Sequence, residues 1–230
     1  MIMTRENELF YLMQMAGGTF PSGGFSQSWG LETYVAEGRV RDEEGFILFA
    51  RAYLESSVAC CEGPVMREAA RLSENWDSME LKKLEELSRA LKAVKESRES
   101  SLRMGKAFMR IMADITEDEK LEELKSEMGQ EGITYPVAYG ALCGRLGLDI
   151  QRAAEAFVFS TVNALTQSAV KLIPLGNKQA QGILLKLYPV MRETVEKSLQ
   201  TPLKDISNFC PALDMAGMRH EYLTTRLYMS

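Results

Sequence analysis

Few residues in this chain have the chemistry that catalysis needs, and histidine is the scarcest of them. His220 is the only histidine among 230 residues, and imidazole is the side chain best suited to acid-base work near neutral pH. Any serine triad must therefore use His220, with Ser26 or Ser28 as the nucleophile. The run 24–28 (GFSQS) begins like a nucleophile elbow, but it lacks the closing glycine and follows no strand pattern. A serine hydrolase is kept as the enzymatic alternative.

A glycine-rich segment at residues 18–25 has the first spacing of a phosphate-binding loop. Gly24 and Phe25 stand where that motif needs its Lys and its Ser or Thr, and a helical pattern rather than a strand precedes the segment. The glycines therefore predict a tight turn with unusual backbone angles and no nucleotide site.

The residues that could bind a metal lack the spacing for it. His220 and Glu221 begin like a zinc-protease helix, but Thr224 takes the place of the second histidine. Adjacent cysteines on a helix point about 100° apart, so Cys60 and Cys61 form no ready chelate. We predict no catalytic residue, no metal ligand and no cofactor, and reduced cysteines that serve as small core residues (Cys60, Cys61, Cys143 and Cys210).

Composition points to a globular protein that does not bind nucleic acid or an anionic membrane. Hydrophobic residues make up 46% of the chain and charged residues 26%, and the net charge is −5. The first eight residues lack the basic and apolar stretches of a signal peptide. The nearly uncharged stretch 156–170 is too short to span a membrane and predicts a buried helix. We expect a cytoplasmic location.

The elements that must position these residues are helical. Leu84, Leu87, Leu91 and Val94 recur at three and four residues, with charged side chains such as Glu85 and Glu86 expected on the solvated faces. Further helices are predicted over 46–57, from an N-cap at Asp149 to Lys171, and over 178–199. No alternating strand pattern is present. The prediction is an all-α, single-domain bundle of roughly nine or ten helices.

Three segments interrupt the helical pattern: 17–28, 129–136 and 201–217. The last contains Pro202, Pro211 and Gly217, which interrupt helix formation, so it predicts a flexible linker. The predicted organisation is a helical body over 1–217 and a C-terminal tail over 218–230 of the same domain. Tyr222, Leu223, Leu227 and Tyr228 give this tail apolar anchors for a partner.

The run 20–32 (FPSGGFSQSWGLE) closely resembles the N-terminal signature of the UreF family of urease accessory proteins. Further similar segments follow in order: 103–105, 135–140, 171–176 with Gln179, and 218–221 followed by Arg226 and Leu227. For the glycines and prolines among them we expect a role in backbone conformation. The signature residues are Pro21, Gly23, Gly24, Phe25, Ser26, Gly30, Leu31, Glu32, Tyr135, Pro136, Lys171, Pro174, Gly176 and Gln179.

The resemblance implies a helical homodimer without a catalytic centre. It also implies assembly with UreH (also called UreD) and the GTPase UreG, in support of nickel insertion into apo-urease. Gln27 and Thr134 stand where many relatives carry histidine, which argues against direct nickel binding by this chain. An unrelated helical regulatory protein remains a third interpretation. The residues expected to engage UreH, as the tail orders on docking, are Arg219, His220, Glu221, Tyr222, Arg226, Leu227 and Tyr228.

Overall fold

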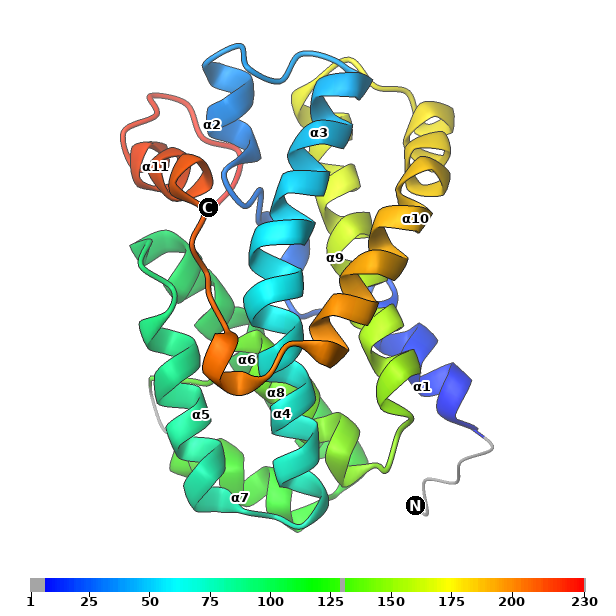
Figure 1. Ribbon diagram of the computed structural model, residues 1–230, viewed down its shortest axis with the longest axis vertical. Helices are drawn as coiled ribbons and strands as arrows, with labels where there is room; N and C mark the ends of the chain where they lie inside the picture. Colours follow the sequence, from blue (N-terminus) through cyan, green and yellow to red (C-terminus); the bar gives the residue numbers. More distant parts are fainter. Residues whose placement is uncertain (1–6, 129–130, 230) are drawn as a thin grey trace.

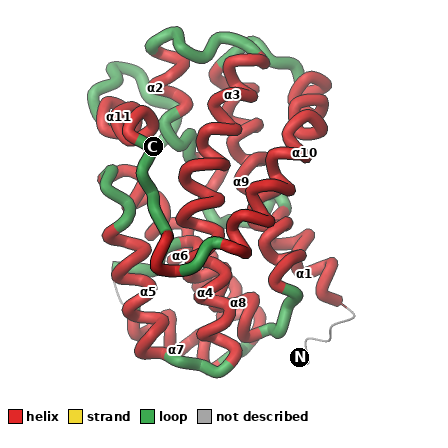
Figure 2. The backbone as a smooth tube through the Cα atoms, in the orientation of Figure 1, coloured by secondary structure: helices red, strands yellow, loops and turns green. Residues whose placement is uncertain are grey.

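The computed structural model describes residues 7–128 and 131–229, and it is built there from helices and the loops that join them (Figures 1 and 2). This described part holds no strand, which confirms the all-α prediction. Its α-helices run from α1 near the N-terminus to α11 near the C-terminus. The beginning of the predicted turn at 129–136, the first six residues and Ser230 lie outside the described residues. In chain order the elements are α1 (Glu8–Ala16), η2 (Gly24–Ser26), α2 (Leu31–Ala36), α3 (Glu43–Tyr53), η3 (Leu54–Glu62), α4 (Gly63–Glu74), α5 (Ser78–Ala90), α6 (Lys95–Thr116), α7 (Glu119–Glu127), α8 (Tyr135–Arg145), α9 (Ile150–Leu172), α10 (Asn177–Gln200), η4 (Leu203–Asp205) and α11 (Pro211–His220).

The centre of the body is a rod in which α3, the π-helix η3 and α4 follow one another directly, with α9 and α10 beside it (Figure 1). Helix α8 packs on α4 so closely that their main chains are in contact. A Cβ placed on Gly140 would lie 2.1 Å from the Met66 carbonyl oxygen, and one on Gly144 would lie 2.1 Å from that of Ala70. Only glycine fits at these two positions, so α4 and α8 are held in van der Waals contact through their main chains.

The long helices α9 and α10 match their predictions. The Asp149 side chain accepts a hydrogen bond from the Arg152 N–H at 2.9 Å, as expected of the N-cap of α9. The helix ends at Leu172, two residues before Pro174, and α10 begins at Asn177. The aromatic rings of the core meet where α6, α8 and α9 converge, with neighbouring ring centroids 5.2 to 6.0 Å apart (Phe20, Phe108, Tyr135, Tyr139 and Phe157).

Helix α5 departs from its prediction on both faces. It ends at Ala90, and Leu87 is exposed, whereas Glu85 is buried. The backbone N–H and the hydroxyl of Thr134 both donate to Glu85 Oε2, at 2.9 and 2.6 Å, and the Arg89 guanidinium contacts the other oxygen. Burial raises the pKa of Glu85, although these partners favour its ionised form. The expectation of a solvated Glu85 is wrong because a loop distant in sequence supplies its hydrogen-bond donors.

The prediction of buried, reduced cysteines is confirmed for two of the four residues. All four are free thiols, and Cys61 and Cys143 are buried. Cys60 and Cys210 are partly exposed, so for them the core assignment is wrong. Burial raises the pKa of the Cys61 thiol to about 11 and raises that of Cys143 as well.

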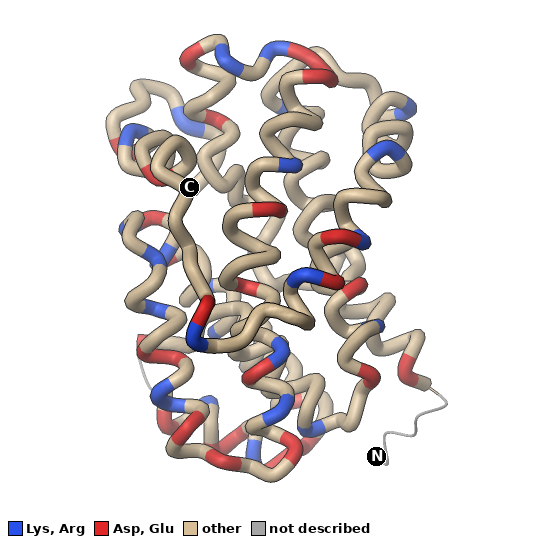
Figure 3. The backbone as a smooth tube through the Cα atoms, in the orientation of Figure 1, with Lys and Arg blue, Asp and Glu red and all other residues tan. Residues whose placement is uncertain are grey.

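Residues of both charge signs are interspersed along the chain. Lys and Arg lie among Asp and Glu along the helices, in keeping with the small net charge of −5 (Figure 3). Within the residues that the structure describes, no helix combines the length and the apolar character needed to cross a bilayer.

Candidate functional site

The segment after α10 is fastened to the central rod and does not form a free linker. Pro64 has no N–H to donate to the Cys60 carbonyl four residues earlier, and the Ser207 N–H donates to that carbonyl instead, at 3.0 Å. Asn208 accepts from the Ser57 hydroxyl at 2.9 Å and donates to the Leu91 carbonyl at 3.2 Å. The flexible-linker prediction therefore fails here.

Helix α11 occupies the rest of the predicted linker. Pro211 lies in its first turn, where a missing N–H costs nothing. Gly217 does not end the helix; it lets α11 approach α6, since a Cβ there would lie 2.9 Å from Val94 Cγ1. The predicted boundary between body and tail at 217/218 thus falls inside α11.

Helix α2, which begins just after the predicted signature turn, carries α11 on one side. Gly30 precedes α2 with a φ of +86°, a value that favours glycine, and a Cβ there would lie 3.6 Å from that of Ala216. The Thr33 hydroxyl donates to the Ala216 carbonyl at 3.0 Å. In Figure 1, α2 and α11 lie side by side next to the C-terminus.

The end of α11 places His220 between two carboxylates, and we call these three residues the carboxylate clamp. His220 Nε2 lies 2.9 Å from Glu32 Oε2 of α2, and Nδ1 lies 2.6 Å from Glu96 Oε2 of α6. The His220 side chain is 0% exposed. The clamp joins the N-terminal signature, the start of α6 and the end of α11.

The residues after α11, 221–229, run back over the signature segment, and we call them the strap. The backbone N–H groups of Leu227 and Tyr228 donate to the two oxygens of Glu32, at 2.7 and 3.1 Å. The Met229 N–H donates to the Ser26 carbonyl at 2.9 Å, and Arg226 Nη1 donates to Glu96 Oε1 at 3.0 Å. The strap is therefore held mainly through its main chain. The carboxylates of Glu32 and Glu96 each contact both His220 of α11 and a residue of the strap.

The seven residues predicted to meet a partner divide into two groups. Five are exposed, and among them Tyr222 is 82% and Leu227 73% exposed (Arg219, Glu221, Tyr222, Arg226 and Leu227). His220 and Tyr228 are buried against the body, with Lys171 Nζ of α9 5.9 Å from the centroid of the Tyr228 ring. In this chain these two side chains therefore contact the body, and the exposed part of the predicted partner surface is formed by the other five.

The signature residues do not form one site. Gly23 has a φ of +85°, as the predicted tight turn requires, and Gly30 has a φ of +86°. Ser26, Glu32 and Lys171 contact the strap, and Gln179 accepts from the Gly176 N–H at 2.8 Å at the start of α10. The others begin helices or line the core or the loops, with Phe25 exposed (Pro21, Gly24, Phe25, Leu31, Tyr135, Pro136 and Pro174). Sequence reasoning missed Glu96, whose neighbours in the chain give no sign of its role.

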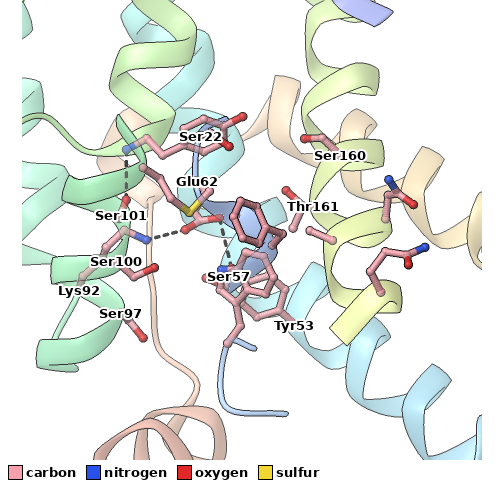
Figure 4. A pocket seen from close by; sticks show the side chains of 18 of the residues that line it. Ser22, Tyr53, Ser57, Glu62, Lys92, Ser97, Ser100, Ser101, Ser160 and Thr161 are labelled. Atoms are coloured by element: carbon pink, nitrogen blue, oxygen red, sulfur yellow. Dashed lines mark hydrogen bonds and ion pairs between the residues drawn. The ribbon is translucent and has the colours of Figure 1, made fainter. Parts of the chain in front are cut away.

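A partly enclosed cavity of about 150 Å³ lies behind α11, between the 17–25 loop, α6, α9 and the segment that leads to α11 (Figure 4). Lys92 Nζ lies 2.5 Å from Glu62 Oε1, and the Tyr53 hydroxyl donates to Glu62 Oε2 at 3.4 Å. Burial alone would lower the pKa of Lys92, but the Glu62 carboxylate outweighs it and the pKa is raised. Hydroxyl groups dominate the remaining polar lining (Ser22, Ser57, Ser97, Ser100, Ser101, Ser160 and Thr161).

The geometry argues against the hydrolase alternative. Both nitrogens of His220 face carboxylates, so neither is placed to take a proton from Ser26 or Ser28. The Ser26 hydroxyl donates to the Gly23 carbonyl at 2.7 Å, and the Ser28 Oγ accepts from the Glu32 N–H at 3.4 Å.

Gln27 and Thr134 are buried, and among the residues described no group of three or more His, Cys, Asp or Glu side chains could hold a metal ion.

The chain matches known proteins over most of its length. The model of the UreF family matches residues 40–188. The urease accessory protein UreF of Sporosarcina pasteurii is 31% identical over 87% of this chain and all of the relative, and that of Bacillus sp. (strain TB-90) is 32% identical over 97% of this chain and all of the relative. A third, from Paenarthrobacter aurescens (strain TC1), is 28% identical over 95% of this chain and 96% of its own length. With its helical body and the signature residues around the clamp, this chain belongs to the UreF family of urease accessory proteins.

Proposed function

We propose that this protein is a cytoplasmic, non-enzymatic scaffold that assembles with UreH/UreD and the GTPase UreG and supports nickel insertion into apo-urease. The observation that carries the proposal is the orientation of the strap. Its main chain is held by Glu32 and Ser26, while Tyr222 and Leu227 project outward. Aromatic and aliphatic side chains that are exposed on a positioned backbone are typical anchors of a protein interface.

Helix α11 extends this surface. Met215 and Met218 are exposed beside Arg219, whose Nη1 lies 3.2 Å from Glu37 Oε1 at the edge of α2. Apolar side chains next to Arg combine the residue types that are enriched in protein interfaces. We assign this face, formed by α11 and the strap, to UreH/UreD, and nickel is cargo of the assembled complex.

The test is co-purification of the full chain with UreH and UreG. Replacing both outward anchors, Tyr222→Ala with Leu227→Ala, should remove UreH from the pull-down and leave the melting curve unchanged, because neither side chain is in the core. A matched control is Met79→Ala with Ile115→Ala, two exposed apolar residues on α5 and α6. UreH that still co-purifies at the wild-type level with the double anchor variant would overturn the assignment of this face.

We also propose that the protein forms a homodimer through an apolar helical face. Helix α1 exposes Leu9, Phe10 and Met13, which makes it the first surface to test. All four cysteines are free thiols, so the proposed dimer does not depend on a disulfide. Light scattering under reducing conditions should therefore still give twice the monomer mass. A monomer at high concentration, alone and with UreH, would contradict this.

A further inference from the structure

His220 is placed so that its protonation state matters to the clamp. An ionised carboxylate accepts hydrogen bonds and donates none. Glu32 Oε2 and Glu96 Oε2 lie within 2.9 and 2.6 Å of the two ring nitrogens, so with both carboxylates ionised each nitrogen needs a hydrogen to donate. The imidazole that satisfies both contacts is therefore the positively charged form.

The charged groups around the ring balance when His220 carries that charge. Glu32 faces it from α2 and Glu96 from α6, while Arg226 of the strap contacts the second oxygen of Glu96. Lys171 of α9 lies over the Tyr228 ring of the strap, and within the described part of the chain it pairs with neither carboxylate of the clamp. The two carboxylates thus meet two cations, His220 and the exposed Arg226, and the imidazole itself is fully buried. Loss of one proton from His220 would turn a nitrogen lone pair toward a buried carboxylate.

We propose that His220 is a proton-dependent positioning residue, which docks α11 and the strap on the body when its imidazole is protonated on both nitrogens and loosens them when it loses a proton. Glu32 couples the ring to the strap, because the oxygen that contacts His220 also accepts from the Tyr228 N–H. The inference rests on the proposed function in one respect only: docking of α11 and the strap would place the partner-binding face. The docking equilibrium is a property of this chain alone.

The direction of the pH effect follows from proton counting. The docked form holds a proton on each nitrogen, whereas a histidine released to water loses one of them above about pH 6.5. The released form therefore binds fewer protons, and docking weakens as pH rises. For one proton the docking constant should fall about tenfold for each pH unit above about 6.5, as long as the docked ring stays charged.

The single histidine makes a direct experiment possible. Tag-free, full-length protein with ¹⁵N-labelled histidine would be titrated from pH 5.5 to 9 by NMR, and amide exchange at Leu227 and Tyr228 would be followed and corrected for intrinsic rates. We expect a doubly protonated ring at pH 7, and exchange protection that falls with the slope given above. A neutral ring at pH 7, or protection that does not change with pH, would overturn the proposal.

Glu96→Gln gives the sharper test. The glutamine amide can donate to Nδ1 and still accept from Arg226, so a neutral ring with its proton on Nε2 satisfies every contact. Protection of the Leu227 and Tyr228 amides should then be independent of pH. Glu99→Gln, one turn along α6 in an exposed pair with Arg103, is the matched control and should behave as wild type. A wild-type pH dependence in Glu96→Gln would overturn the proposal.

Pull-down of UreH at pH 6.5 and pH 8.5 separates this proposal from the proposed function. If the ring and the strap titrate as expected but UreH binding does not follow, the clamp stands and the assignment of the partner face fails. If the ring is neutral at pH 7 and the variant with Tyr222→Ala and Leu227→Ala still loses UreH, the clamp proposal fails and the partner face stands.

Discussion

The contact between α4 and α8 and the contact between the strap and the body both join segments that are distant in sequence. The first consists of apolar packing, and the second consists mainly of hydrogen bonds to carboxylates and carbonyls. Gly140 and Gly144 bring two helical backbones together among apolar side chains. The strap instead contacts Glu32, Glu96 and Ser26 through main-chain N–H groups and Arg226, and its most exposed side chains point away from the body.

The difference explains which contact can open. Parting α4 from α8 would leave a void or expose core residues, with nothing in water to replace the lost packing. Parting the strap exposes the Tyr228 ring but otherwise carboxylates and N–H groups that water can hydrogen-bond, so the net cost is smaller than that of parting α4 from α8. We therefore expect the strap to undock from the body more readily than α8 parts from α4.

The largest loss of stability is expected from Lys92→Met, inside the body. The change removes the partner of Glu62 and leaves a buried carboxylate without a compensating charge, which costs about 3–5 kcal/mol. Urea denaturation measures the change. Lys83→Met, which breaks an exposed pair with Glu80, should stay within about 0.5 kcal/mol of wild type. A loss below about 1 kcal/mol for Lys92→Met would show that this pair does not stabilise the body.

Gly140→Ala should come next, because its Cβ would press on the Met66 carbonyl at the contact between α4 and α8. Overpacking against a backbone atom should cost about 3 kcal/mol. Gly182→Ala is the matched control, since nothing lies within 4 Å of a Cβ at that helical position. That control should gain about 0.4–1 kcal/mol from its higher helix propensity. Equal stability of the two variants would contradict the close packing of α4 and α8.

Glu32→Ala should act on the strap and leave the body folded. It removes the acceptor of Leu227, Tyr228 and His220, and a loss of about 1–3 kcal/mol of docking free energy follows. Hydrogen exchange at the strap amides should approach unprotected rates while the far-ultraviolet circular dichroism stays helical. Glu193→Ala, an exposed carboxylate of α10, should leave the strap protected. Cooperative unfolding of the whole protein would show that strap and body are one unit.

Thiol reactivity should give the smallest effect, and it distinguishes the buried core from partly exposed positions beside it. Cys60 and Cys210, both partly exposed, should react first with a thiol reagent at pH 8. Burial raises the pKa of Cys61 to about 11 and that of Cys143 as well, so little thiolate is present and access is blocked. All four should react in denaturant. Native Cys143 reacting as fast as Cys210 would contradict the burial of the core.

The sequence predicts best what is decided locally. The cap at Asp149, the end of α9 near Lys171 and the tight turn at Gly23 all appear where expected. Each depends on the backbone preferences of a few adjacent residues.

The contacts of the C-terminal segment could not be predicted in this way. His220 meets Glu32 and Glu96, which are 188 and 124 residues away in the chain. Pro211 and Gly217 suggested a linker because both disfavour a helix interior, yet Pro211 begins α11 and Gly217 allows its approach to Val94. The same residue types serve flexible and closely packed segments, and only the tertiary contacts distinguish them.

The most direct test is a truncation after Glu221, which keeps α11 intact and removes the strap with its outward anchors and its contacts to Glu32, Glu96 and Ser26. The truncated chain should stay helical, with a thermal midpoint within about 4 °C of wild type for a loss near 1 kcal/mol, and it should no longer co-purify with UreH. A sharp drop in the midpoint would mean that the strap belongs to the core. Retained co-purification of UreH with the folded, truncated chain would contradict the scaffold's partner-binding face.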